Sequence, residues 1–181
     1  MLRKIFKNII TKKASLPFPE GFRLLPEDAA GIVSLQKKID SIFGRSLRIR
    51  QVDAGSCNAC EWECTALTNP VYDIQRFGID FVASPRHADA LLVTGPVSRQ
   101  MELALKKTYR ATPEPRLVIA CGDCAIDGGI YKGSYAVTNG VANIIPVDCY
   151  IPGCPPTPFQ IIYGIEKLLE MLVLRRPEPG L

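Results

Sequence analysis

The chain has 181 residues, of which 47% are hydrophobic and 22% charged, which suits one compact domain and argues against disorder. Its formal net charge is +4, but five of the cations fall within residues 1–13, so the remainder is near neutral and nucleic-acid binding is disfavoured. Seven cysteines without a secretory apolar segment predict a reducing compartment, the cytoplasm. No apolar run approaches the roughly 20 residues that a membrane-spanning helix needs.

The N-terminal residues 1–13 predict an amphipathic helical arm. Apolar side chains recur there at helical spacing, opposite the lysines: Leu2, Ile5, Phe6, Ile9 and Ile10. Such a stripe suits either the surface of a membrane or the groove of a partner protein, and the sequence does not separate the two.

A linker and a second helix follow, together forming residues 14–46. Residues 14–26 are rich in proline and predict an irregular connector. Residues 27–43 place apolar side chains three and four apart, with Gly44 directly after them, which predicts a second amphipathic helix.

The main domain is predicted over residues 47–174, with a flexible tail at 175–181. Five short apolar runs alternate there with segments able to form helices, and we expect strands at 47–52, 79–83, 90–94, 117–120 and 143–147. A closing helix is expected at 159–174. This alternation predicts an α/β fold with a parallel sheet covered on both faces.

Cysteines follow three of the predicted strands. Cys57 and Cys60 come after the first strand, Cys121 and Cys124 after the fourth, and Cys154 after the fifth. Because sites in parallel sheets form outside the carboxyl ends of strands, we expect these segments to converge. Thiolate ligands favour zinc or an iron–sulfur cluster, and the spacing alone leaves both open, together with simple buried thiols.

Four ordered motifs carry a resemblance to a known family: residues 55–63, 84–89, 122–125 and 146–156. The chain resembles the family that joins the 20-kDa chain of respiratory complex I to the small subunits of group 4, membrane-bound [NiFe] hydrogenases. The similarity spans roughly residues 47–165. Complex I chains carry two adjacent cysteines where this chain has Cys57 and Cys60 spaced by two residues, so the hydrogenase branch is the better match, and His87 after Arg86 points the same way.

The resemblance implies a flavodoxin-like, doubly wound sheet and one [4Fe–4S] cluster, the one nearest the active site of the complex. Matched residue by residue, the ligands are Cys57, Cys60, Cys124 and Cys154. The remaining thiols, Cys64, Cys121 and Cys149, are not ligands in the family pattern, although Cys121 is an alternative because it forms its own CxxC with Cys124.

Other residues near these motifs have both a functional and a structural interpretation. Glu63 is either a proton relay beside the cluster or a carboxylate that bonds a helix turn or a partner. Arg86 and His87 are predicted at the same sheet edge as the cysteines, where they contact a partner or tune the cluster, or else cap a helix. Trp62 is an interface or core anchor.

The resemblance therefore predicts an electron-transfer subunit of a membrane-bound, energy-converting [NiFe] hydrogenase, peripheral on the cytoplasmic side of the membrane and not catalytic alone. The implied partners are a large subunit with the nickel–iron centre, a ferredoxin-like iron–sulfur subunit and membrane subunits that translocate ions. The alternatives are a quinone-reducing, complex I-like assembly, a hydrogenase-related complex without nickel and, more distantly, a zinc-stabilised scaffold.

Overall fold

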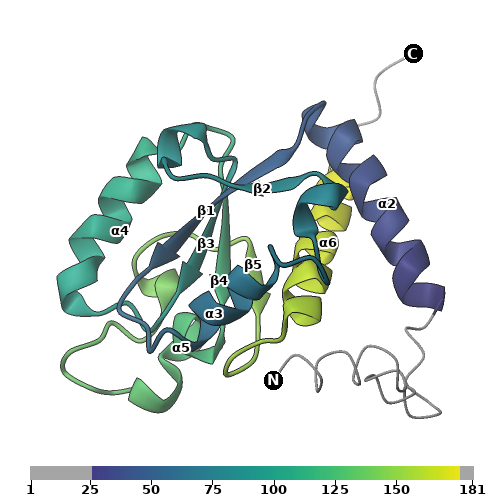
Figure 1. Cartoon of the computed structure of the whole chain (residues 1–181). Coiled ribbons are helices and arrows are strands. Elements are labelled where there is room, and N and C mark those ends of the chain that lie inside the picture. Colours follow the sequence, from purple (N-terminus) through teal and green to yellow (C-terminus); the bar gives the residue numbers. More distant parts are fainter. Residues whose placement is uncertain (1–25, 176–181) are drawn as a thin grey trace, which may run out of the picture. The chain divides into compact units, whose positions relative to one another are not determined.

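Five parallel strands form a sheet in the order β2-β1-β3-β4-β5 (Figure 1). Their bounds are β1 Leu47–Asp53, β2 Ile79–Phe81, β3 Ala90–Thr94, β4 Leu117–Cys121 and β5 Cys149–Ile151. The structure is a computed structural model that describes residues 26–175, with side chains from residue 35 to 174. This strand order is that of flavodoxin-like, doubly wound folds, so the predicted fold class is confirmed.

The central strands are buried on both faces. In β3, Ala90 and Leu92 belong to one apolar core, whereas Leu91 and Val93 belong to a second core on the opposite face. This division follows the two-residue period of a strand. Every residue of β3 and β4 is buried, which explains why these runs show no alternation with polar residues.

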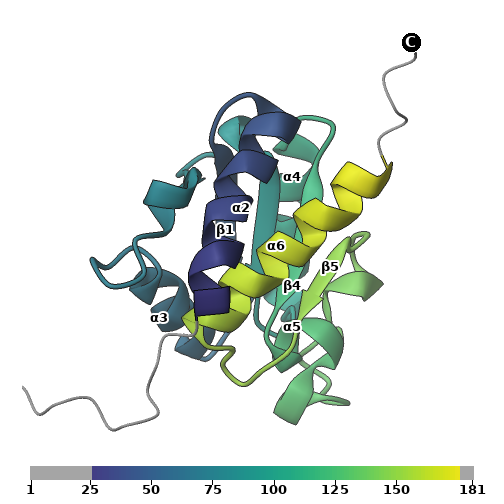
Figure 2. The same ribbon diagram turned by 90° about the vertical axis from the view of Figure 1, so that its right-hand side faces the viewer.

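Helices cover the two faces of the sheet. One core contains side chains of α2 (Pro26–Phe43, here from Leu35 on), α3 (Ala59–Ala66) and α6 (Pro158–Arg175). The other core contains side chains of α4 (Arg99–Ala111) and α5 (Asp123–Asp127). Figure 2 shows α2 and α6 crossing in front of the sheet.

An ion pair network joins α2 to α6. The Nζ atom of Lys38 lies 2.9 Å from an oxygen of Glu166 and 2.8 Å from one of Glu170. After α2, Gly44 adopts φ +63° and its amide donates to the Asp40 carbonyl at 2.9 Å, as expected for the glycine that ends a helix. The predicted second helix is thereby confirmed. Among the described helices, none has the length and apolarity to cross a membrane.

The fifth strand is not where the apolar run 143–147 predicted it. That segment follows a 3₁₀ turn at Val141–Asn143, and its Ile145 is buried in the core with Val141. The run therefore covers a face of the sheet instead of extending it, and Pro146 has no amide proton to donate to a neighbouring strand. The strand begins at Cys149, which pairs with Ile119 of β4.

The described residues include only part of the predicted division into regions. The N-terminal arm 1–13, the linker up to residue 25 and residues 176–181 lie outside the described residues. Helix α6 runs from Pro158 to Arg175, so the first residue of the expected tail is the last residue of this helix. The domain boundaries themselves stay a prediction.

Candidate functional site: a cysteine edge

The loop between β1 and α3 is fixed by its own side chains and by the loop after β3. The amides of Gly55 and Ser56 both donate to Oδ1 of Asp53, each at 2.8 Å. The Ser98 amide donates to the Ala54 carbonyl at 2.8 Å. This loop leads into Cys57, which is exposed, and into Cys60 in the first turn of α3, which is buried.

The loops after β4 and β5 are joined to each other. The Asp123 amide donates to the Gly153 carbonyl at 2.9 Å, and the Gly153 amide donates to Oδ1 of Asp123 at 2.8 Å. Cys124 follows Asp123 and Cys154 follows Gly153, so this pair of hydrogen bonds sets the two cysteine segments side by side. Cys124 is half-buried and Cys154 is exposed.

Two glycines allow the backbone to approach the thiols closely. A Cβ atom at Gly122 would lie 2.7 Å from Sγ of Cys60, and one at Gly129 would lie 3.0 Å from Sγ of Cys124. Gly122 also has φ +91°, a conformation that disfavours other residues. Cys60, which follows the loop after β1, thus packs against the backbone of the loop after β4.

Two of the predicted ligands have raised pKa values. Burial raises the pKa of Cys60 to about 12, and the neighbouring Glu61 and the thiols of Cys64, Cys57 and Cys124 contribute. Burial likewise raises the pKa of Cys124, with Cys154 and Cys57 contributing. The loop contacts described above place Cys57, Cys60, Cys124 and Cys154 at the carboxyl edge of the sheet, where α3 and α5 lie in Figure 1.

The other three thiols lie in the interior. Cys121 faces the core from the last position of β4, where a hydrogen bond with Cys64 and burial raise its pKa. Cys149 packs beneath α6, with Sγ 3.6 Å from the Gly164 carbonyl oxygen, and burial raises its pKa. These three behave as small apolar residues, which agrees with their predicted structural role.

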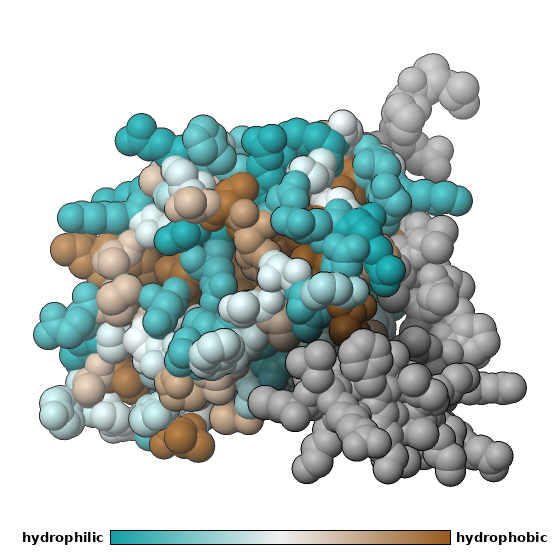
Figure 3. All heavy atoms as spheres, in the orientation of Figure 1, coloured by the Kyte–Doolittle hydropathy of each residue, from teal (hydrophilic) through white to brown (hydrophobic). Residues whose placement is uncertain are grey.

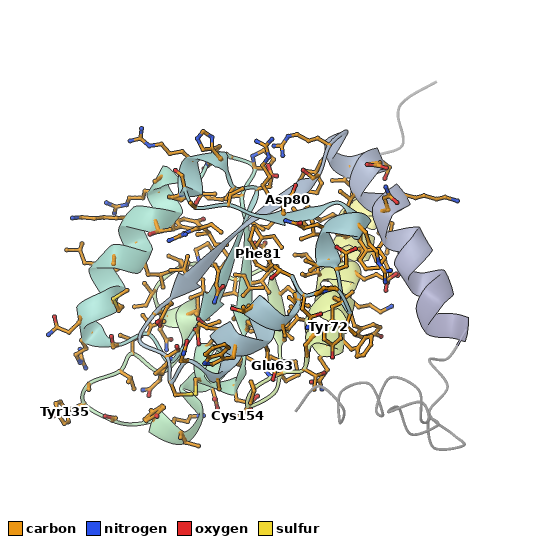
Figure 4. All side chains as sticks on the ribbon, viewed as in Figure 1. Glu63, Tyr72, Asp80, Phe81, Tyr135 and Cys154 are labelled. Carbon is orange, nitrogen blue, oxygen red and sulfur yellow. The ribbon has the colours of Figure 1, made fainter. Side chains whose placement is uncertain are left out.

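A half-buried carboxylate at this edge has no role predicted from the sequence. Glu61 of α3 accepts a hydrogen bond from the hydroxyl of Thr94, the buried last residue of β3. Its second oxygen, Oε2, is buried and has no hydrogen-bond partner among the described residues. The singled-out Glu63 is half-buried, and Figure 4 shows it at the same edge as Cys154.

Arg86 and His87 do not lie at the cysteine edge, so that prediction was wrong. They form the short helix η2 (Pro85–His87) that precedes β3. Strand β2 is only three residues long, and its last residue and the first residue of β3 both pair with Ile49 of β1. The connecting residues therefore stay near the start of the strands, away from the cysteines.

Large apolar side chains are exposed on the segments that carry the cysteines. Trp62 of α3 is 68% exposed, and Ile130 and Tyr135, in the segment after α5, are 80% and 89% exposed. Figure 4 shows Tyr135 projecting from this edge, and Figure 3 shows apolar groups exposed along it. Trp62 is thus no core residue, and this surface suits a protein partner.

The thiols are the groups at this edge that could hold a cofactor. Within the described part of the chain, no three Cys, His, Asp or Glu side chains are grouped as ligands of a single metal ion. Soft thiolates suit zinc and iron–sulfur clusters, and close-packed backbone, as at Gly122 and Gly129, is what surrounds the sulfurs of a protein-bound cluster. The donor set thus fits an iron–sulfur cluster.

A parallel α/β sheet with thiols gathered at its carboxyl edge is a scaffold suited to a soft metal centre. The chain belongs to the family described as NADH ubiquinone oxidoreductase, 20 Kd subunit, whose model matches residues 57–168. The predicted family and the assignment as an oxidoreductase subunit are confirmed.

Relatives of known name support the same family. Formate hydrogenlyase subunit 7 of Escherichia coli is 46% identical over 77% of this chain, which spans only 53% of that relative's length. The probable membrane-bound hydrogenase subunit mbhJ of Pyrococcus furiosus is 45% identical, over 76% of this chain and 84% of the relative. The chain is a membrane-bound hydrogenase-like or complex I-like 20-kDa subunit.

Solved structures agree on the fold. A chain of the membrane-bound sulfane sulfur reductase, an archaeal respiratory membrane complex, superposes with a TM-score of 0.66 at 35% identity, covering 80% of this chain and 77% of that one. A chain of an NAD⁺-reducing [NiFe]-hydrogenase superposes with a TM-score of 0.53 at 22% identity, covering 76% of this chain and 98% of that one.

Proposed function

We propose that this chain is the electron-transfer subunit of a membrane-bound [NiFe]-hydrogenase complex and holds the [4Fe–4S] cluster nearest the active site. The observation that carries the proposal is that the loops bearing Cys57, Cys60, Cys124 and Cys154 lie on one edge of the sheet and contact one another. The similarity to hydrogenase subunits supports the same function.

The chain's own residues would hold the thiols and exclude water. Asp53 fixes the loop before Cys57, and Asp123 joins the loops that carry Cys124 and Cys154. The low exposure of Cys60, 9%, keeps solvent from one ligand. A bound cluster would supply one-electron transfer, and thiol deprotonation, which burial opposes here, would be favoured by the charge of the iron.

The exposed apolar side chains beside the cysteines support docking of a large subunit that contains the nickel–iron centre. Trp62, Ile130 and Tyr135 would be covered by it. A ferredoxin-like subunit would exchange electrons with the cluster, and ion-translocating membrane subunits would hold the complex at the cytoplasmic side of the membrane. Glu63 is proposed as a proton relay near the cluster.

Serine substitution of each thiol tests the ligand set. We expect Cys57→Ser, Cys60→Ser, Cys124→Ser and Cys154→Ser to lower the iron content and visible absorbance of the purified complex. Cys121→Ser and Cys149→Ser are the matched controls and should retain the cluster. Loss of the cluster in Cys121→Ser but not in Cys124→Ser would refute this ligand assignment.

A second candidate function is a hydrogenase-related complex without nickel, because the similar chain of 35% identity belongs to a complex named a sulfane sulfur reductase and not a hydrogenase. Metal analysis of the complex, isolated anaerobically through a tag on this chain, separates the candidates. Nickel with abundant iron supports the hydrogenase. Iron without nickel supports the nickel-free complex or a quinone-reducing assembly, whereas zinc without iron supports a scaffold and ends the electron-transfer proposal.

A further inference from the structure

A cavity lies at the opposite end of the strands from the cysteines. It has a volume of about 370 Å³, and its polar lining comes chiefly from Arg45 and Arg48 at the start of β1 and from Arg86 and His87 of η2. Phe43 and Pro113 are among the apolar residues that line it. The cavity thus combines a cationic lining with an apolar wall.

Asp89, one of the two acidic residues that line this cavity, already has hydrogen-bond partners for both of its carboxylate oxygens. Asp89 accepts from both terminal nitrogens of Arg45, at 2.8 and 2.7 Å, and from the Arg48 amide at 3.0 Å. The bidentate contact raises the pKa of Arg45. Asp89 therefore neutralises Arg45 and holds the backbone of Arg48, and its oxygens are not directed at the guanidinium group of Arg48.

The other acidic side chain is also paired. Glu114 forms an ion pair with Arg116, which additionally donates to the carbonyl oxygens of Tyr109 and Thr112 at 2.8 and 3.0 Å. Over the part of the chain that the structure describes, the side chains of Arg48, Arg86 and His87 form no ion pair or hydrogen bond. Two guanidinium groups and an imidazole are thus left for a ligand.

We propose that this cavity binds a phosphate group. Guanidinium groups present planar, paired donors that match the oxygens of phosphate, and Arg48 and Arg86 approach from two different elements. The volume exceeds that of a bare ion, and the apolar wall formed by Phe43 and Pro113 suits the remainder of the ligand. The ligand is therefore a phosphate ester, either a phospholipid headgroup or a free organic phosphate.

The test uses the full-length chain in its purified complex, with pyrophosphate and vesicles as probes. The pocket variant is Arg48→Gln with Arg86→Gln. The control is Lys37→Gln with Lys107→Gln, which removes the same charge from exposed positions on α2 and α4 that do not line the cavity. Residues 1–13 are identical in both variants, so they contribute equally to any difference in lipid binding. Vesicles are phosphatidylcholine alone or with phosphatidylglycerol.

We expect the pocket variant to bind at least about tenfold more weakly and the control to bind like the unaltered chain, since each charge-assisted hydrogen bond lost weakens binding by roughly this factor. Loss confined to anionic vesicles identifies a lipid headgroup, and loss confined to pyrophosphate identifies a free phosphate. Equal binding by the pocket and control variants to both probes would overturn the proposal. Arg86→Lys keeps the positive charge at this exposed position but loses the paired donors of the guanidinium group. It should fold like the unaltered chain and bind with an affinity between those of the unaltered chain and the pocket variant.

This inference is independent of the cluster proposal. The cavity and the cysteines lie at opposite ends of the strands, so apo-protein that has lost all iron should still bind phosphate. Absence of the cluster with retained phosphate binding would contradict only the proposed function.

Discussion

Asp123 and Gly153 exchange two hydrogen bonds across the loops that follow β4 and β5. The Asp123 amide donates to the Gly153 carbonyl at 2.9 Å, and the Gly153 amide donates to the Asp123 carboxylate at 2.8 Å. Because Cys124 and Cys154 are the next residues, one side chain determines how two proposed ligands from separate loops face each other.

Removing that side chain should loosen the edge. We expect Asp123→Ala to lower the free energy of unfolding by about 1–2 kcal/mol, since the Gly153 amide loses its partner. The iron content of the complex should fall as well. Asp123→Asn keeps an oxygen acceptor and should lie close to the unaltered protein. Chemical denaturation and iron analysis of the three proteins check this, and equal iron in all three would show that the pair does not position the ligands.

Gly122 provides a second test of the cysteine edge. In Gly122→Ala the new methyl group would meet Sγ of Cys60 at 2.7 Å, so the thiol or the loop must move. Gly133 also has a positive φ, +80°, but a Cβ there meets no atom within 4 Å. Gly133→Ala, the control, should carry backbone strain of about 1–2 kcal/mol. Gly122→Ala, at φ +91° and ψ 153°, should carry about 1–3 kcal/mol and should also lose cluster absorbance. Similar absorbance in the two variants would contradict the close packing of Cys60.

The sequence predicts the sheet and the cysteine edge well because both depend on local signals. Buried parallel strands appear as continuous apolar runs, and the carboxyl ends of such strands share one edge, so Cys57 and Cys124 were expected to meet. The prediction of a strand at 143–147 was wrong because a run of apolar residues that covers a face of the sheet looks the same in sequence as a buried strand. In the structure Ile145 covers the sheet, and the strand begins only at Cys149.

Two other features depend on pairings between distant residues, which spacing does not encode. Arg86 follows β2, and residues that follow parallel strands usually lie at the carboxyl edge of the sheet, so the sequence predicts Arg86 at the edge that holds the cysteines. The rule fails because Phe81 and Ala90 both pair with Ile49, and the chain never travels to the far end of the sheet between them. Glu61 meets its partner Thr94 across 33 positions of sequence.

The contact between Thr94 and Glu61 is open to direct test. In Thr94→Val the hydroxyl is lost, so Oε1 of Glu61 loses its donor beside the buried Oε2, which has no partner among the described residues. We expect the free energy of unfolding to fall by about 1–3 kcal/mol, the usual cost of an unsatisfied buried acceptor. Thr94→Ser retains the hydroxyl and should recover most of this loss. If Val and Ser variants unfold alike in urea, the hydrogen bond contributes little.

Glu170 should make stability depend on pH in the acid range. Hydrogen bonds from Lys167 and Lys38 lower its pKa from the ordinary 4.5 to about 2. A carboxylate whose pKa is lowered by folding stabilises the folded state above its unfolded pKa, and this contribution is lost as the pH falls from about 4.5 toward 2. Because the side chain is 36% exposed, solvent screening keeps the contribution below about 1 kcal/mol.

Glu170→Gln should therefore unfold more easily than the unaltered chain near neutral pH, and the difference should disappear as the pH approaches 2. Urea unfolding at several pH values measures both curves. Asp73→Asn is a suitable control, since Asp73 has no ion pair within the described residues and its replacement should leave the pH dependence in place. A constant difference between the Glu170→Gln and unaltered curves across this range would mean that the amide changes packing between α2 and α6 and that the charge of Glu170 is not what stabilises their contact.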